Sequence, residues 1–170
     1  MSLETLVAVD PSLRSTGYAV LSRQGGKIVC REFGAIRNKP ALRPSSCLLA
    51  IRDHLRALIQ KYEPQSMAVE GVIFVQSYQT AITLGAARGA AILAAAECGL
   101  PVHEYAPRRV KQAVVGRGAA DKQQVAFMVR ALLGLTETPP ADAADALAIG
   151  LTHFQTADAA RIKRVPLEQI

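Results

Sequence analysis

Residues 5–21 read TLVAVDPSLRSTGYAVL, and this stretch decides the fold. Its first five residues are apolar and β-rich, and they predict a buried strand that stops at the turn signal Asp10-Pro11. A second strand is predicted over Thr16–Leu21, and a third over Lys27–Ala35 after the hairpin turn Gly25-Gly26. Three strands in succession predict antiparallel pairing at the start of a sheet, with Asp10 at the end of its first strand.

Beyond this hairpin, strands alternate with helices. Apolar residues recur at helical spacing over residues 45–62, with Ser45 or Ser46 as the expected N-cap. The other predicted elements are the strands Met67–Val69 and Val102–Tyr105 and the helices Thr80–Cys98, Arg108–Val115, Asp121–Leu133 and Ala141–Phe154. Strands joined through helices need crossover connections, so an α/β fold with a mixed five-stranded sheet covered by helices is predicted. Residues 1–156 are expected to form one domain, and residues 157–170 a flexible tail.

Composition limits the class of protein. The chain has 170 residues, half of them hydrophobic, which suits one domain with a real core and excludes intrinsic disorder. No basic segment precedes an apolar run at the N-terminus, and Arg88 interrupts the most apolar stretch, so neither a secretory signal nor a membrane span is expected. The three cysteines show no disulfide or zinc pattern and are interpreted as buried free thiols of a reducing, cytoplasmic compartment.

Four of the 14 acidic residues occupy unusual positions. Asp10 and Glu70 each follow a short apolar strand. Asp142 and Asp145 are the only charges in the helical run ADAADALAIG, and their i, i+3 spacing places them on one helix face. Asp10 alone could make a turn, and Asp142 alone could be a first-turn acid of its helix. Glu70 at the end of a buried strand is harder to explain without a partner.

Taken together, four acids at the edges of apolar elements would repel one another unless a cation neutralised them. No His or Cys cluster offers softer ligands, so the expected ion is Mg²⁺, with Mn²⁺ as a substitute. Two such ions about 3.5–4 Å apart would clamp the attacking and leaving oxygens of a phosphodiester. That the four acids meet is an inference from their placement on strand ends and one helix face.

Basic residues support a phosphate substrate. The net charge of the chain is +6, and residues 107–130 hold six cations against one acid, Asp121. Such groups beside a metal site would hold a nucleic-acid backbone, although a solvated helix face is the ordinary alternative. The candidate DNA contacts are Lys111, Lys122, Arg109, Arg117, Arg14 and the aromatic Phe74.

These residues together resemble the RuvC-type Holliday-junction resolvases of the ribonuclease-H-like superfamily. The similarity runs from about Leu6 to Phe154. Its most specific motifs are VDP with TGY at residues 9–18, VEG at 69–71, LGAARG at 84–89, VKQ at 110–112 with Gly116 and Gly118, KQQV at 122–125 and ADAADALAI at 141–149.

The resemblance implies a fold, an activity and partners. The fold would be a ribonuclease-H-like mixed sheet with helices on both faces. Asp10, Glu70, Asp142 and Asp145 would form the catalytic tetrad that binds two metal ions, and Lys111 and Lys122 would hold the junction backbone. The enzyme would be a homodimer that nicks two strands symmetrically, leaving 5′-phosphate and 3′-hydroxyl ends, and would work with a RuvA- and RuvB-type branch-migration motor. The helix Thr80–Cys98 would lie near the dimer interface.

Departures from the family pattern leave alternatives open. Ser12 and Ala19 replace frequent glycines, and Ile73 stands where a wedge Phe is common, so Phe74 is the candidate wedge. A phage-type nuclease of broader branched-DNA specificity, an inactive branch-binding module and an ATP-binding protein of the actin and sugar-kinase class remain alternatives. Proteins of the actin and sugar-kinase class carry a second phosphate-binding loop, which this sequence does not contain. His153, eight residues after Asp145, could approach the metals or cap a helix end.

Overall fold

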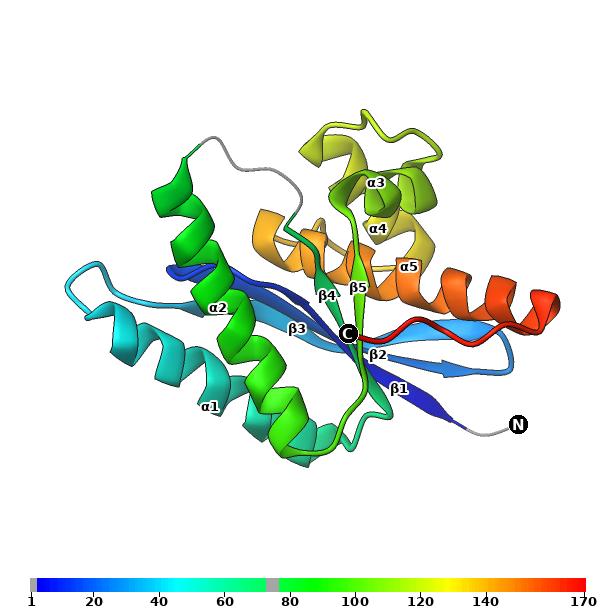
Figure 1. Cartoon of the computed structure of the whole chain (residues 1–170). Helices are drawn as coiled ribbons and strands as arrows, with labels where there is room; N and C mark the ends of the chain where they lie inside the picture. The colour runs from blue at the N-terminus through cyan, green and yellow to red at the C-terminus, as the bar shows by residue number, and fades with distance from the viewer. Residues whose placement is uncertain (1–2, 73–76) are drawn as a thin grey trace.

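The computed structural model describes residues 3–72 and 77–170 (Figure 1). Five strands and five helices are formed by these residues. They are β1 (Glu4–Asp10), β2 (Ser15–Gln24), β3 (Lys27–Arg37), α1 (Pro44–Tyr62), β4 (Ser66–Glu70), α2 (Tyr78–Glu97), β5 (Val102–Tyr105), α3 (Pro107–Val115), α4 (Lys122–Leu133) and α5 (Ala141–Lys163). Every element predicted from the sequence is present.

The strands form one sheet in the order β3-β2-β1-β4-β5. The first three strands pair antiparallel, whereas β4 pairs parallel to β1 and β5 pairs parallel to β4. The α1 and α2 segments provide the long crossovers that parallel pairing requires. The predicted mixed five-stranded sheet is therefore confirmed.

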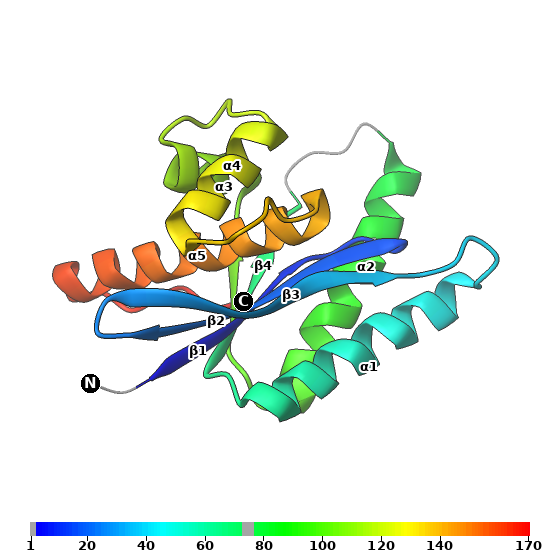
Figure 2. The same ribbon diagram turned by 180° about the vertical axis from the view of Figure 1, so that it is seen from behind.

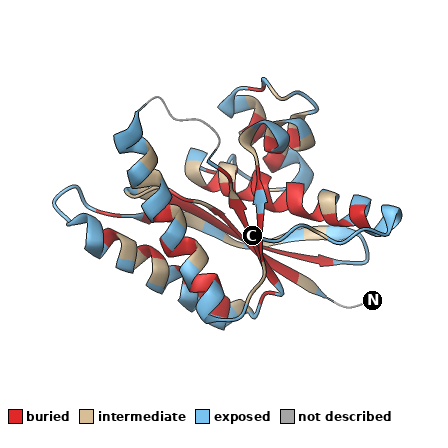
Figure 3. Cartoon of the chain, viewed as in Figure 1, coloured by how far each residue is buried: buried red, intermediate tan, exposed pale blue. Residues whose placement is uncertain are grey.

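Helices cover both faces of the sheet, α1 and α2 on one and α3, α4 and α5 on the other (Figures 1 and 2). Side chains alternate between the two faces along each strand. In β1, Leu6 and Ala8 pack toward α5, whereas Val7 and Val9 pack toward α1 and α2. The buried residues concentrate along the sheet between these layers (Figure 3).

Two helix ends differ from prediction. The N-cap of α1 is Arg43, with Pro44 in the first turn, so the predicted Ser45 or Ser46 cap is wrong. Proline suits the first helical turn because its missing N–H needs no partner there. The last helix continues to Lys163, beyond the predicted end at Phe154, because Ala157 and Ala160 extend its buried face.

The last residues return to the edge of the sheet. The Ile170 N–H donates to the Val102 carbonyl, and the Glu168 carbonyl lies 2.7 Å from Nδ1 of His103. These contacts tie the end of the chain to β5. The flexibility expected of residues 157–170 stays a prediction.

All three cysteines are free, as expected, but only Cys47 is fully buried. Cys98 is exposed, so its predicted burial is wrong, because it caps α2 where that helix emerges from the core. Among residues 3–72 and 77–170, we find no helix with the length and apolar character needed to cross a membrane.

Candidate active site

Asp10 and Glu70 lie at neighbouring strand ends on the same face of the sheet. Strands β1 and β4 are parallel, with Val9 opposite Val69, so both strands deliver their last residue to one edge. Strand alternation then sets the face. Asp10 follows Leu6 and Ala8, and Glu70 follows Ala68, all of which pack toward α5. The two carboxyls therefore point toward the α5 side.

Asp142 and Asp145 reach the same region from the first turns of α5. Both side chains are half-buried, while the helix residues between and after them belong to the core. Gly17, directly opposite Asp10 in the β1–β2 ladder, allows α5 to come this close. A Cβ at Gly17 would lie 2.6 Å from the backbone carbonyl carbon of Asp142. Glycine is therefore required where β2 meets the start of α5.

Ser15, at the start of β2, fixes the orientation of Asp142. Its Oγ donates a hydrogen bond of 2.5 Å to Oδ2 of Asp142. The sequence analysis missed this residue, because no local pattern links two positions more than a hundred residues apart. Its position two residues before Gly17, on the same face of β2, is the signal that could have found it.

The acids interact strongly with one another. Burial, reinforced by the charges of Glu70 and Asp145, raises the pKa of Asp10 to about 8. Burial and the charge of Asp145 also raise the pKa of Glu70, while a hydrogen bond from the Asp10 carboxyl lowers it. At neutral pH, and without a cation, a proton therefore resides on Asp10 and is shared with Glu70.

Two predicted lysines stand beside the acids. Nζ of Lys122, at the start of α4, lies 3.4 Å from Oδ2 of Asp145, and this carboxylate raises the pKa of the ammonium. Burial raises the pKa of Asp145, and Lys122 and Lys111 oppose that shift. Lys111, on α3, also lowers the pKa of Glu70. The structure thus brings the four predicted acids and both lysines into one electrostatic unit.

The donor set fits a hard divalent cation. Four carboxylates supply only oxygen, which Mg²⁺ and Mn²⁺ prefer. Burial first, and then the charges of Glu70 and Asp145, disfavour the ionised form of Asp10, and a bound cation would favour it. Within residues 3–72 and 77–170, no three His, Cys, Asp or Glu side chains already form a metal cage. Oδ2 of Asp142 accepts from Ser15 and Oδ2 of Asp145 accepts from Lys122, which leaves Oδ1 of each carboxylate for an ion.

The structure gives separate positions for two further predicted DNA contacts, Arg109 and Arg117. Arg109 donates to Thr156 of α5, and Thr156 is about 16 Å along the helix axis from Asp145. Arg117 is exposed in the loop after Gly116. Phe74, like Ile73, lies outside the described residues. Among these candidates, Arg109 is therefore not brought to the acids.

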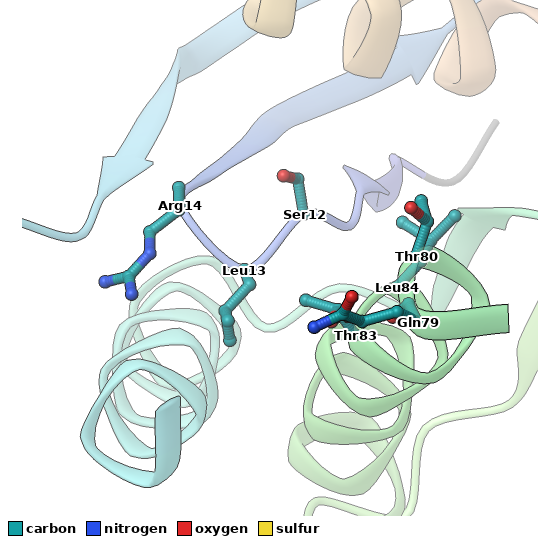
Figure 4. A pocket seen from close by; sticks show the side chains of 7 residues that line it. All are labelled: Ser12, Leu13, Arg14, Gln79, Thr80, Thr83 and Leu84. Atoms are coloured by element: carbon teal, nitrogen blue, oxygen red, sulfur yellow. Dashed lines mark hydrogen bonds between the residues drawn. The ribbon is translucent and has the colours of Figure 1, made fainter. Parts of the chain in front are cut away.

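Arg14 is also engaged elsewhere. Its Nη1 donates to the carbonyls of Lys39 and Leu42 at 2.9 and 3.0 Å. The side chain extends from the β1–β2 turn toward the start of α1 (Figure 4). Arg14 therefore organises the loop between β3 and α1.

His153 does not reach the acids and does not cap a helix end. It is buried in the middle of α5, where Nδ1 lies 3.0 Å from the Tyr105 hydroxyl and Nε2 lies 3.5 Å from Oγ of Ser66. Ser66 begins β4, about 13 Å along the strand from Glu70. Burial and the neighbouring His103 lower the pKa of His153 to about 4, so it is a neutral core residue.

A groove of about 370 Å³ with polar and apolar lining opens beside the turn that follows Asp10 (Figure 4). It lies between the β1–β2 turn and the first turns of α2. Its lining residues are Ser12, Leu13, Arg14, Gln79, Thr80, Thr83 and Leu84. None of the four acids lines this groove.

Comparison with known proteins identifies the relatives of this chain. The family described as crossover junction endodeoxyribonuclease RuvC matches residues 6–153. A RuvC of Akkermansia muciniphila is 56% identical over 153 residues, which cover 90% of this chain and 92% of that protein. A RuvC of Marinobacter nauticus is 49% identical over 150 residues, covering 87% and 84% of the two chains.

Solved structures agree with these matches. Thermus thermophilus RuvC in complex with a Holliday junction substrate superimposes with a TM-score of 0.87 at 34% identity, covering 98% of this chain and 99% of that one. The yeast mitochondrial Holliday junction resolvase Ydc2 has a TM-score of 0.67 at 12% identity, covering 94% and 81% of the two chains, which shows a shared fold.

Proposed function

The chain belongs to the RuvC family of crossover junction endodeoxyribonucleases, and from this premise we propose which of its residues resolve a four-way DNA junction and how. It is a nuclease that acts on Holliday junctions in recombination and repair. We assign Asp10, Glu70, Asp142 and Asp145 as the catalytic carboxylates. The observation that carries this assignment is geometric: β1 and β4 end side by side with Asp10 and Glu70, and the start of α5, which carries Asp142 and Asp145, packs against Gly17 opposite Asp10.

The four carboxylates would hold two divalent cations, Mg²⁺ or Mn²⁺. When bound, these ions activate a water molecule and stabilise the departing 3′ oxygen. The water oxygen forms a bond to phosphorus and the P–O3′ bond breaks, which leaves 5′-phosphate and 3′-hydroxyl ends. Ser15 would hold Asp142 in the orientation a ligand needs, as outer hydrogen bonds commonly do for metal-binding carboxylates.

Lys111 and Lys122 would hold the DNA backbone. Lys122 is the more exposed of the two and contacts Asp145 in the absence of DNA. If a cation bound Asp145, the Lys122 ammonium would be free to contact a phosphate oxygen. The surface of α3 and α4 would therefore bind the strand that is cut.

Two like nicks in one junction call for two active sites, so we propose a homodimer. Its support is an apolar groove of about 410 Å³ between α1 and α2, next to the exposed side chains Leu49 and Leu93. Small residues along α2, among them Ala86 and Gly89, would let a second copy approach closely. We further propose cytoplasmic action and cooperation with a RuvA- and RuvB-type motor, on the strength of family membership alone.

One experiment tests this assignment. The purified protein is incubated with a synthetic immobile four-way junction, a flap and a linear duplex, each with Mg²⁺ or with chelator, and the nicks are mapped. We expect paired nicks in the junction only when Mg²⁺ is present. Equal cutting of the flap would favour a branched-DNA nuclease of broader specificity.

Variants then assign the residues. Asp142→Asn or Glu70→Gln should abolish cutting and leave junction binding nearly intact, because the lysines remain. Lys111→Ala should weaken binding and flatten its salt dependence. Near-normal cutting by either acid variant would remove that residue from the site.

A further inference from the structure

The four-residue set Arg14, Arg37, Lys39 and Arg43 forms a second basic surface, here named the β3–α1 surface. All four residues are exposed. No acidic residue occurs between Glu32 and Asp53 in the sequence. In the described part of the chain, none of the four takes part in a salt bridge, whereas Arg52, further along α1, pairs with Asp53 and Glu97.

This surface lies at the active-site end of the sheet. Arg37, the last residue of β3, is directly opposite Ser15 in the ladder, and paired residues point to the same face. Ser15 points to Asp142, so Arg37 also lies on the α5 face. The β3–α1 loop extends from the same end of the sheet as the start of α5 (Figures 1 and 2).

The loop that presents the charges is held in one shape. The Arg14 guanidinium bonds to the Lys39 and Leu42 carbonyls, and the Asn38 N–H donates to the Arg14 carbonyl at 2.9 Å. The Asn38 side-chain amide donates to the Leu13 carbonyl at 2.8 Å. Because the loop is already tied to the β1–β2 turn, little conformational entropy is lost when its cations bind a partner.

The acidic cluster therefore lies between two cationic surfaces. In the sheet order β3-β2-β1-β4-β5, Asp10 and Glu70 end the central strands β1 and β4. The β3–α1 surface follows the edge strand β3, and α3, which carries Lys111, follows the opposite edge strand β5. A single phosphate at the acids cannot use both, since they belong to different elements on opposite sides of the cluster. A continuous polyanion that crosses the site can use both.

We propose that the β3–α1 surface binds the DNA backbone beyond the scissile phosphate, on the side away from α3 and α4. Arg37, Lys39 and Arg43 make the phosphate contacts, and Arg14 positions the loop that carries them. This inference rests on the proposed function, since it takes Asp10, Glu70, Asp142 and Asp145 as the place of cutting.

The test compares two double variants on the same strand. Arg37→Ala/Lys39→Ala removes two charges of the β3–α1 surface. Lys27→Ala/Arg31→Ala removes two exposed charges of β3 that lie about 20 Å or more from Arg37 along the strand. Binding to a fluorescent four-way junction is measured by anisotropy at several salt concentrations with Ca²⁺ in place of Mg²⁺, and unfolding curves check that both variants fold.

The slope of log K against log salt is negative, and we expect Arg37→Ala/Lys39→Ala to make it shallower by about 2. The control pair should change this slope by less than about 0.5. Arg43→Ala should remove about one further contact. Equal slopes for the two double variants, or a loss as large in the control, would overturn the proposal. Wild-type cutting is measured alongside: absence of nicking would refute the proposed function, whereas normal nicking with unchanged slopes would refute only the β3–α1 surface.

Discussion

Replacing Asp10 with Asn should stabilise the metal-free protein while abolishing cutting. Asp10 keeps its proton up to about pH 8 in the fold, because ionisation would place a buried charge beside Glu70 and Asp145. The unfolded carboxyl, with a pKa of 3.8, has released that proton at pH 7. Keeping Asp10 protonated in the fold lowers the free energy of unfolding by as much as about 4 kcal/mol at pH 7, at about 1.36 kcal/mol per pKa unit.

The sign follows from proton counting. Between about pH 4 and pH 8 the folded protein binds one more proton at Asp10 than the unfolded chain, so this residue makes stability fall as pH rises. Asparagine is neutral, has nearly the same shape and can still donate to Glu70. The stability gap between Asp10→Asn and wild type should therefore be small near pH 4 and should grow with pH to as much as about 4 kcal/mol at pH 7.

Urea unfolding in chelator at pH 5, 6, 7 and 8 measures this gap. Asp53→Asn, at an exposed position of α1, is the matched control and should change stability little at any pH. Adding Mg²⁺ should stabilise the wild type, because a bound cation takes over the role of the proton, and should not stabilise Asp10→Asn. A variant that is no more stable than wild type at pH 8, or a gap that does not change with pH, would refute this account of the acidic cluster.

Three further predictions concern the surroundings of the acids. Ser15→Ala should weaken Mn²⁺ binding in calorimetry by about tenfold, and Ser15→Thr should retain it; equal affinities would deny Ser15 a positioning role. Gly17→Ala should cost about 1–3 kcal/mol and reduce cutting about a hundredfold, because its Cβ meets the Asp142 backbone. Gly85→Ala, with open space around it, is the control for stability, and a similar loss of stability there would contradict the steric argument. His153→Gln should be less stable than wild type at pH 7, but the gap should narrow by about 3 kcal/mol toward pH 4, since wild-type stability falls as the pH drops from 6.5 to 4; a constant gap would mean that His153 titrates normally.

Strand alternation made much of the site predictable from sequence. Apolar residues at every position of Leu6–Val9 indicate a strand covered on both faces, and the parity of Asp10 assigns it to the face of Leu6 and Ala8. Glu70 follows by the same rule from Ala68. The i, i+3 pair on α5 required only helical spacing. The sequence does not indicate which helix covers that face, because the residues of β4 and β5 do not reveal which helices pack against them.

The residues whose surroundings differ from expectation depend on side-chain partners. Arg109 and Lys111 belong to one basic segment, but they differ by two positions in a helix and point to different faces, and the role of Arg109 as a DNA contact stays a prediction. The mixed charge of residues 155–170 predicts a helix end near His153, whereas buried Ala157 and Ala160 extend α5 to Lys163. Charge and spacing in the sequence identify a group of residues, but contacts across the core decide which of these residues lie near the four acids.

The acidic cluster also explains why Lys122 touches Asp145. The ammonium lies beside Asp145, and its charge lowers the pKa of Asp10, which burial and the neighbouring carboxylates raise. The contact is 3.4 Å long and the lysine side chain is largely exposed, so it is a weak and easily exchanged interaction. A tighter ion pair would stabilise the fold more but would compete with cation binding. The weakness of this pair would therefore allow Asp145 to exchange Lys122 for the cation that we propose it binds.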